Sequence, residues 1–260
     1  MKAYEQILFQ KENGRAYITF NRAEKLNAIT PRLAKEFVDA IENAESDDKV
    51  RVIIVTGAGA AFCAGADLGE MIPLITSGSS EIIDLVGKMV LKHMIIKKPI
   101  IAAVNGNCVA GGTELLQATD IRIASEEANF GLPEPRWGIV PMGGSHVRLP
   151  RQIPYCHAME LLLTGEMIDA YEALRIGLIN RVVPSEKVLA VSEEYAEKIC
   201  SKAPLAIASI KETVIRCLSS PMEEAFYLEE ALSYKVLKSE DAQEGPRAFI
   251  EKRAPSFKGH

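Results

Sequence analysis

The chain has 260 residues and a formal net charge of −5, from 30 Lys and Arg against 35 Asp and Glu. Hydrophobic residues make up 48% and charged residues 25%, which predicts a soluble globular protein with one large domain or two small ones and excludes a disordered or coiled-coil chain. Scattered basic residues and an apolar run of only residues 100–104 predict neither a nucleic-acid partner, which needs clustered positive charge, nor a membrane span of ~20 residues.

Two strands, a helix and a third strand are predicted first. Asn13-Gly14 has the composition of a tight hairpin turn, so residues 6–12 and 15–20 are expected to pair as antiparallel strands. Thr30-Pro31 opens a helix, because Thr is a favoured N-cap residue and Pro fits the first helical position. In chain order there follow a strand at residues 50–55, a helix at 82–94, a strand at 100–104, a short helix from Gly112 and a strand at 121–124.

Strands that alternate with helices predict crossover connections and a largely parallel sheet. From Ser185 on, the pattern is helical almost throughout, and Pro204 and Pro221 each stand where a helix can begin. We therefore expect an α/β core over residues 1–184 and a helical C-terminal region over residues 185–260.

Cysteine and histidine usage indicates an intracellular protein without a metal site. The five cysteines include no C-x-x-C pair, which is typical of free thiols in a reducing compartment. The four histidines are isolated and lack the spacing of metal ligands. The N-terminal residues lack the apolar segment of a secretion signal, so a cytoplasmic location is expected.

Two glycine-rich loops, residues 61–68 and 105–115, each follow a predicted strand. Small residues let a ligand approach the backbone, and a helix that begins at Gly111-Gly112 directs unpaired N–H groups and its dipole toward negative charge. Two such donors facing one oxygen make an oxyanion hole. Tight strand–helix turns are the alternative, but two such loops in successive βα units favour a ligand site at the carboxyl ends of the strands.

Two glutamates accompany these loops. Glu114 lies in the first turn after Gly111-Gly112, and Glu134 lies between two prolines. In such apolar or rigid settings, desolvation can raise the pKa of a carboxyl group to a value useful for acid–base catalysis. The alternatives are charge compensation at a helix N-terminus for Glu114 and a surface turn for Glu134. As a pair beside the loops, they indicate acid–base chemistry next to a carbonyl group.

With these motifs the chain resembles the crotonase superfamily, and within it the enoyl-CoA hydratases, essentially from end to end. The matching segments are residues 21–28, FCAGADL at 62–68, KPIIAAVNG at 98–106, AGGTEL at 110–115, FGLPE at 130–134, LTG at 163–165 and residues 249–258.

The resemblance implies the ClpP/crotonase fold, an α/β spiral of repeated ββα units followed by a helical C-terminal trimerisation region. It implies an acyl-CoA thioester as substrate, with coenzyme A as part of the substrate, no further cofactor and no metal. It also implies a homo-oligomer, a trimer or a dimer of trimers, while the charge and hydropathy above predict no nucleic-acid or membrane partner.

The resemblance further assigns roles to individual residues. The N–H groups of Ala66 and Gly111 match the oxyanion hole that holds the thioester carbonyl. The substrate- and CoA-binding positions are Ala64, Ala66, Asp67, Leu68 and Gly111, together with Phe249 and Lys252, which match positions that hold CoA from a neighbouring subunit.

Glu114 and Glu134 match the two carboxylates of the hydratases, in which the first deprotonates the attacking water and the second donates a proton to C2. The implied reaction is hydration of a 2-enoyl-CoA to a 3-hydroxyacyl-CoA, or the reverse dehydration, as in fatty-acid β-oxidation. The alternatives are carnitinyl-CoA dehydration, double-bond isomerisation, thioester hydrolysis and, in a different class, a non-enzymatic RNA-binding relative. Gly69 stands where a lysine is frequent, and Arg136-Trp137 replaces a more aliphatic segment and is a candidate to shape the acyl pocket.

Overall fold

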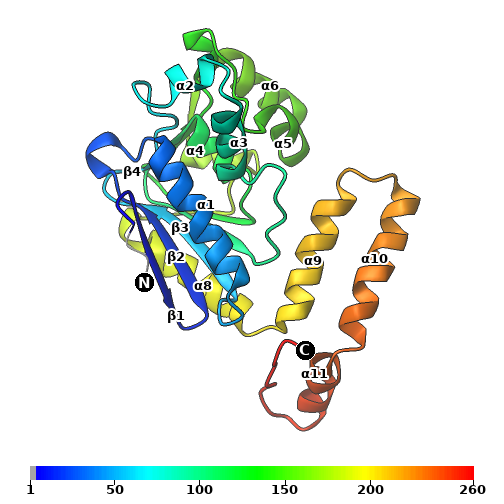
Figure 1. Cartoon of the computed structure of the whole chain (residues 1–260). Helices are drawn as coiled ribbons and strands as arrows, with labels where there is room; N and C mark the ends of the chain where they lie inside the picture. Colours follow the sequence, from blue (N-terminus) through cyan, green and yellow to red (C-terminus); the bar gives the residue numbers. More distant parts are fainter. Residues whose placement is uncertain (1–3) are drawn as a thin grey trace.

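Two β-sheets form the centre of the chain, and the computed structural model describes residues 4–260 (Figure 1). Within those residues the larger sheet has six strands in the order β1-β2-β3-β5-β7-β10, and only the β1–β2 pair is antiparallel. The smaller sheet has four strands in the order β4-β6-β8-β9, and β9 is antiparallel to β8. The strands are β1 (Ile7–Glu12), β2 (Arg15–Phe20), β3 (Val52–Gly57), β4 (Ala61–Cys63), β5 (Ile100–Val104), β6 (Asn107–Val109), β7 (Ile121–Ser125), β8 (Asn129–Gly131), β9 (Met167–Asp169) and β10 (Arg181–Val183).

Successive units of the chain supply one strand to each sheet. Strands β3, β5 and β7 of the larger sheet are followed directly by β4, β6 and β8 of the smaller one, and a helical segment then returns the chain. This repeated order confirms the expected spiral of ββα units. Cys63 of β4 pairs with Cys108 of β6 in the smaller sheet, and both side chains are fully buried.

The larger sheet is covered on both faces. Ile53 and Val55 of β3 belong to the main core, which includes the buried face of α1 (Pro31–Ser46). Their neighbours Val52 and Ile54 point to the other face and contact α8 (Val188–Cys200). A strand that is buried on both faces explains the continuous apolar run in its sequence.

The predicted helices occur in the predicted order, and one of them ends earlier than expected. The helix expected at residues 82–94 is α3 (Ser80–Met89), and it ends early because Leu91 and His93 adopt left-handed backbone conformations with φ of 53° and 59°. The three-residue strands of the smaller sheet are too short to show a periodic pattern. The remaining helices are α2 (Ile72–Thr76), α4 (Gly111–Leu116), α5 (Ser145–Gln152), α6 (Tyr155–Thr164), α7 (Ala170–Arg175), α9 (Pro204–Cys217), α10 (Met222–Leu237) and α11 (Glu240–Ile250), with 3-10 turns at Ala23–Lys25, Glu134–Trp137 and Ser185–Lys187.

The C-terminal helices extend away from the sheets. Helices α9 and α10 run side by side as a hairpin, and α11 follows at its end (Figure 1). No residue of α10 is buried, and the hairpin exposes large apolar side chains, among them Ile210, Leu218, Tyr227 and Leu237. Across residues 4–260, every helix is too short or too polar to cross a bilayer.

Buried Asn27 ties the first glycine-rich loop to the rest of the core. Its amide group donates to the carbonyl oxygens of Ala58 at 2.9 Å and Ala61 at 2.7 Å, and its side-chain oxygen accepts the N–H of Arg22 at 2.9 Å. The N–H of Ala64 in turn donates to the backbone oxygen of Leu26 at 3.0 Å. These bonds fix the path of the chain on both sides of the loop.

Replacing Asn27 should therefore destabilise the protein. We expect Asn27→Ala to lower the free energy of unfolding by about 2–4 kcal/mol, because it leaves buried backbone groups without partners. Urea denaturation measures the change, and Asn43→Ala, on the exposed face of α1, is the control with an expected change within about 0.5 kcal/mol. Equal stability of the two variants would contradict the structural role given to Asn27.

Candidate active site

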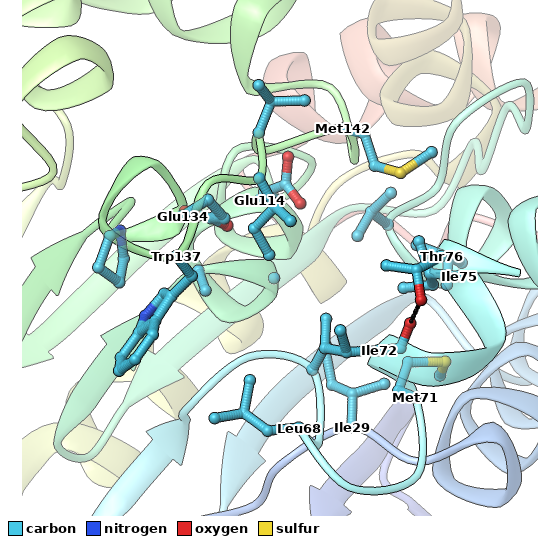
Figure 2. A pocket seen from close by; sticks show the side chains of 18 of the residues that line it. Ile29, Leu68, Met71, Ile72, Ile75, Thr76, Glu114, Glu134, Trp137 and Met142 are labelled. Atoms are coloured by element: carbon cyan, nitrogen blue, oxygen red, sulfur yellow. Dashed lines mark hydrogen bonds between the residues drawn. The ribbon is translucent and has the colours of Figure 1, made fainter.

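A cavity of about 410 Å³ lies where the two glycine-rich loops meet helices α2, α3 and α4 and the segment from 133 to 142 (Figure 2). Its volume is in the range of small-molecule sites. It is lined by Ile29, Ala64, Ala66, Leu68, Met71, Ile72, Ile75, Thr76, Val86, Met89, Val90, Ala110, Gly111, Glu114, Pro133, Glu134, Trp137, Gly138, Ile139, Val140 and Met142.

The two loops touch each other through their backbones. A Cβ atom on Gly65 would lie 2.6 Å from the Cβ of Ala110 and 3.3 Å from the backbone nitrogen of Gly111. A Cβ atom on Gly111 would lie 3.8 Å from the backbone nitrogen of Ala66. The N–H groups of Ala66 and Gly111 are therefore neighbours at the wall of the cavity.

Both of these N–H groups lack an acceptor among residues 4–260. Ala66 forms a parallel bridge with Ile29, in which Ile29 bonds to the residues on either side of Ala66, so the Ala66 N–H is left free. Gly111 is the first residue of α4, and the N–H groups of a first helical turn have no intrahelical partner. The residue before it, Ala110, has φ of 51° and ψ of −124°, an unfavourable conformation for alanine that sets the direction in which α4 begins.

Glu114 is a buried carboxyl group at the start of α4, with 5% of its surface exposed. Burial raises its pKa to about 7, although the backbone N–H groups of Gly143 and Ser145 lower it. A Cβ atom on Gly143 would lie 2.4 Å from Oε2 of Glu114, so only glycine leaves room for the carboxyl group there. Its other oxygen, Oε1, has no hydrogen-bond partner among the described residues.

Glu134 begins the 3-10 turn after β8 and is also buried, with 7% of its surface exposed. Burial and, to a smaller extent, the negative charge of Glu114 together raise its pKa to about 7. Its Oε2 atom has no hydrogen-bond partner in the described part of the chain. Figure 2 shows both carboxyl groups pointing into the same cavity. Two interacting carboxyl groups lose their protons in two steps that belong to the pair, so one state holds a single proton.

Other residues expected at the site divide into two groups. Ala64 and Leu68 line the cavity, whereas Asp67 acts within the loop: its carboxylate accepts the N–H groups of the next turn and pairs with Arg22 at 3.3 Å. Phe249 and Lys252 lie at the end of α11 and do not line the cavity.

The adjacent residues Arg136 and Trp137 have different surroundings in the structure. Arg136 forms an ion pair with Glu166 at 2.8 Å and does not line the cavity. Trp137 does line it, and 67% of its surface is exposed. Of the two residues proposed to shape the acyl pocket, only the tryptophan borders it.

Arg148 joins the site although no sequence motif indicates it. Its guanidinium group donates to the carbonyl oxygens of Val90 at 2.7 Å and Leu91 at 3.0 Å, which connects α5 to the end of α3. Its positive charge also lowers the pKa of Glu114. The one local sequence signal is the Gly143-Gly144 pair before α5, because glycine lets the backbone approach the side chains of Glu114 and Arg148 closely.

The fold and the cavity together define a crotonase-fold enzyme. A family model described as enoyl-CoA hydratase/isomerase matches residues 10–260, and the chain belongs to this family. It is 43% identical to enoyl-CoA hydratase EchA19 of Mycobacterium tuberculosis, over 96% of this chain and 95% of that one. It is 39% identical to the carnitinyl-CoA dehydratase of Citrobacter koseri, over 98% and 99% of the two chains.

Solved structures give the same result. The chain superposes with a TM-score of 0.91 on a putative enoyl-CoA hydratase/isomerase from Mycobacterium abscessus, at 41% identity over 98% of this chain and 100% of that one. The TM-score is 0.93 for the enoyl-CoA hydratase of Bacillus anthracis, at 34% identity over 98% and 100%. The superfamily and the fold inferred from the sequence motifs are both confirmed.

The raised pKa of Glu114 has a consequence for stability. Between pH about 4.5 and about 7 the folded protein holds a proton on Glu114 that the unfolded chain releases, so stability falls as pH rises through this range. Glu114→Gln removes this loss, and we expect it to raise the free energy of unfolding at pH about 8.5 by about 1–3 kcal/mol relative to wild type, with little change at pH about 4.

Urea denaturation at the two pH values measures this difference. Glu42→Gln, on the exposed face of α1, is the control, and it should change stability equally at both pH values. A Glu114→Gln variant that is less stable than wild type at the higher pH would contradict the claim that burial of the ionised Glu114 carboxylate destabilises the folded protein.

Proposed function

We propose that this protein hydrates 2-enoyl-CoA thioesters to 3-hydroxyacyl-CoA thioesters and catalyses the reverse dehydration. The observation that supports this most directly is the placing of Glu114 and Glu134 on one cavity, beside the unpaired N–H groups of Ala66 and Gly111. One ionised and one protonated carboxyl group are what the addition of water across a conjugated double bond requires.

In the proposed reaction the thioester oxygen accepts the N–H groups of Ala66 and Gly111. Glu114, ionised, takes a proton from water as the water oxygen bonds to C3. The electron pair of the double bond moves toward the thioester oxygen, where the two donors stabilise the enolate. Glu134, protonated, then delivers its proton to C2. The proton held by Glu114 returns to Glu134 through solvent, which closes the cycle.

The reaction is redox-neutral acid–base chemistry, so we propose no cofactor beyond the coenzyme A that the substrate carries. The backbone of residues 64–68, with Gly111, is proposed to bind the substrate next to the thioester. Phe249 and Lys252 lie outside the cavity of their own chain, which fits a role at the CoA site of a neighbouring copy. We accordingly propose a homo-oligomer, a trimer or a dimer of trimers, formed by the helical C-terminal region. A cytoplasmic location is proposed from the sequence.

Replacing either carboxyl group should remove most of the activity. We expect Glu114→Gln and Glu134→Gln each to lower kcat with crotonyl-CoA by about 10²–10⁴-fold, while binding of a saturated acyl-CoA persists. The rate follows from the loss of absorbance of the conjugated enoyl thioester. Glu166→Gln is the matched control. Glu166 is the exposed ion-pair partner of Arg136, and this variant should retain the wild-type rate. Near-normal turnover by either of the first two variants would exclude the two-carboxylate mechanism.

The pH dependence of kcat/KM should be bell-shaped with both limbs near neutral pH. At low pH Glu114 becomes protonated and the base is lost, whereas at high pH Glu134 becomes ionised and the acid is lost. In the residual activity of Glu134→Gln, the alkaline limb should disappear and the acid limb should remain. Retention of both limbs in this variant would show that another group is the acid.

A further inference from the structure

Two buried polar side chains close to Glu114 have no part in the proposed reaction. Gln117 follows the last residue of α4, the helix that carries Glu114, and Ser145 is the first residue of α5. Their exposed fractions are 2% and 0%, and neither residue lines the cavity. Because polar groups buried this completely normally have hydrogen-bond partners, those partners indicate what the two side chains do.

The neighbours of the Gln117 side-chain amide determine its orientation. One terminal atom lies 3.2 Å from the backbone oxygen of Thr113 and 2.8 Å from Oγ of Ser145. A carbonyl oxygen only accepts hydrogen bonds, so the atom beside it must be the amide nitrogen, Nε2. Nε2 therefore donates to both oxygens. Since Oγ of Ser145 accepts from Gln117, its own hydrogen is free to point elsewhere.

The hydroxyl group of Ser145 donates this hydrogen to Glu114. The carboxyl group of Glu114 accepts the N–H groups of Gly143 and Ser145 together with the Ser145 hydroxyl, and each donor lowers its pKa. The positive charge of Arg148 acts in the same direction. All of these influences come from residues 143–148, at the start of α5 and just before it.

Among the described residues, Glu134 has no comparable set of donors. Its own N–H is the one hydrogen-bond donor that lowers its pKa, and the charge of Glu114 raises it. The charged groups of the described chain that act on Glu114 are thus Arg148 and Glu134. Burial brings the pKa of both glutamates to about 7, so the donors at the start of α5 are what distinguishes them.

Gln117 also holds α5 at its other end. The backbone oxygen of Gln117 accepts Nε2 of Gln152, the last residue of α5, at 2.8 Å. Oε1 of Gln152 in turn accepts the guanidinium group of the buried Arg122 at 2.9 Å. One residue at the end of α4 therefore bonds to the first and the last residue of α5. The helix cannot move relative to Glu114 without breaking these bonds.

We propose that Gln117 and Ser145 are positioning residues that make Glu114, and not Glu134, the base of the reaction. Gln117 holds the start of α5 against Glu114 and directs the Ser145 hydroxyl toward it. The donated hydrogen bond then stabilises the ionised carboxylate. This inference rests on the proposed function for the reaction itself, and it adds the reason why two similar carboxyl groups take different roles.

The location of one proton is what the two positioning residues control. In its singly protonated state the carboxyl pair can carry this proton on either glutamate. A proton on Glu134 leaves Glu114 free to accept a proton from water, whereas a proton on Glu114 removes both the base and the acid. A hydrogen bond to the ionised form of Glu114 shifts the proton to Glu134 and so favours the arrangement that hydrates the substrate.

The first test removes the hydroxyl group with Ser145→Ala. Glu114 should then bind its proton at higher pH, because its ionised form has lost a donor. We expect the acid limb of the kcat/KM profile with crotonyl-CoA to move up by about one pH unit, and the alkaline limb to move less. A lower rate or stability with an unmoved acid limb would show a merely structural role and overturn the proposal.

Ser192→Ala is the matched control for this substitution. Ser192 is also fully buried, but its hydroxyl donates to the backbone oxygen of Val188 within α8, at 2.8 Å. The pH profile of this variant should equal that of the wild type. An equal upward shift in both serine variants would show that the acid limb responds to any loss of a buried hydroxyl, which would also overturn the proposal.

The second test asks whether Gln117 acts through Ser145. Gln117→Met keeps the size of the side chain and removes the donor, and it should move the acid limb in the same direction as Ser145→Ala. In the double variant Gln117→Met should add no further shift, because the hydroxyl that it directs is absent. Shifts that add in the double variant, or no shift in Gln117→Met alone, would refute the role assigned to Gln117.

A measurement without turnover separates this inference from the proposed function. NMR of the side-chain carboxyl carbons in protein with isotope-labelled glutamate follows the protonation of Glu114, whose signal is the one missing in Glu114→Gln. Its titration midpoint should rise by about one pH unit in Ser145→Ala. This rise without hydration of any enoyl-CoA would refute the proposed function and leave the control of Glu114 ionisation standing. Hydration of crotonyl-CoA with an unmoved midpoint would refute the positioning role alone.

Discussion

The close approach of two backbones, at Gly65 and Gly111, is the constraint on which the rest of the site depends. A side chain on Gly65 would collide with Ala110, and one on Gly112 would lie 2.5 Å from the backbone oxygen of Cys63. Only glycine allows the end of β4 and the start of α4 to meet this closely. The two sheets supply the rigidity, because β4 and β6 are paired within the smaller sheet while β3 and β5 anchor the same units in the larger one. The free N–H groups of Ala66 and Gly111 consequently lie next to each other at the wall of the cavity.

In the proposed mechanism, the apolar surroundings of the two glutamates determine their acid–base behaviour. Burial raises the pKa values of Glu114 and Glu134 toward neutrality, so one carboxyl group can act as a base while the other acts as an acid. A mutation that admitted water to the cavity would therefore lower the pKa values of both carboxyl groups. Arg148 connects this carboxyl pair to the cavity wall, because it donates hydrogen bonds at the end of α3 and its charge lowers the pKa of Glu114.

The parts of the fold that could be predicted from the sequence are those that local chemistry determines. Asn13-Gly14 forms the hairpin turn, and Thr30 caps α1 by accepting the N–H of Leu33. The strands of the smaller sheet escape prediction because three residues cannot show a period. At the site, the glycine-rich loops and both glutamates were predictable from motifs. The opposite wall of the cavity was not, because Met71 before α2 and Met89 at the end of α3 reach the same cavity as Glu114 only through the tertiary fold.

The free thiols of Cys63 and Cys108, on the neighbouring strands β4 and β6 within the two glycine-rich loops, bear on how the enzyme withstands oxidants. Burial raises the pKa of Cys63 to about 12 and that of Cys108 well above its ordinary value, so neither sulfur is ionised at neutral pH. Peroxide and alkylating reagents attack the thiolate, and they reach exposed sulfurs first. The accessible thiol of Cys156 would be consumed while the buried sulfurs of Cys63 and Cys108 stay reduced. The strand pair that supports the loops is thus chemically inert, although it is built with two residues usually associated with reactivity.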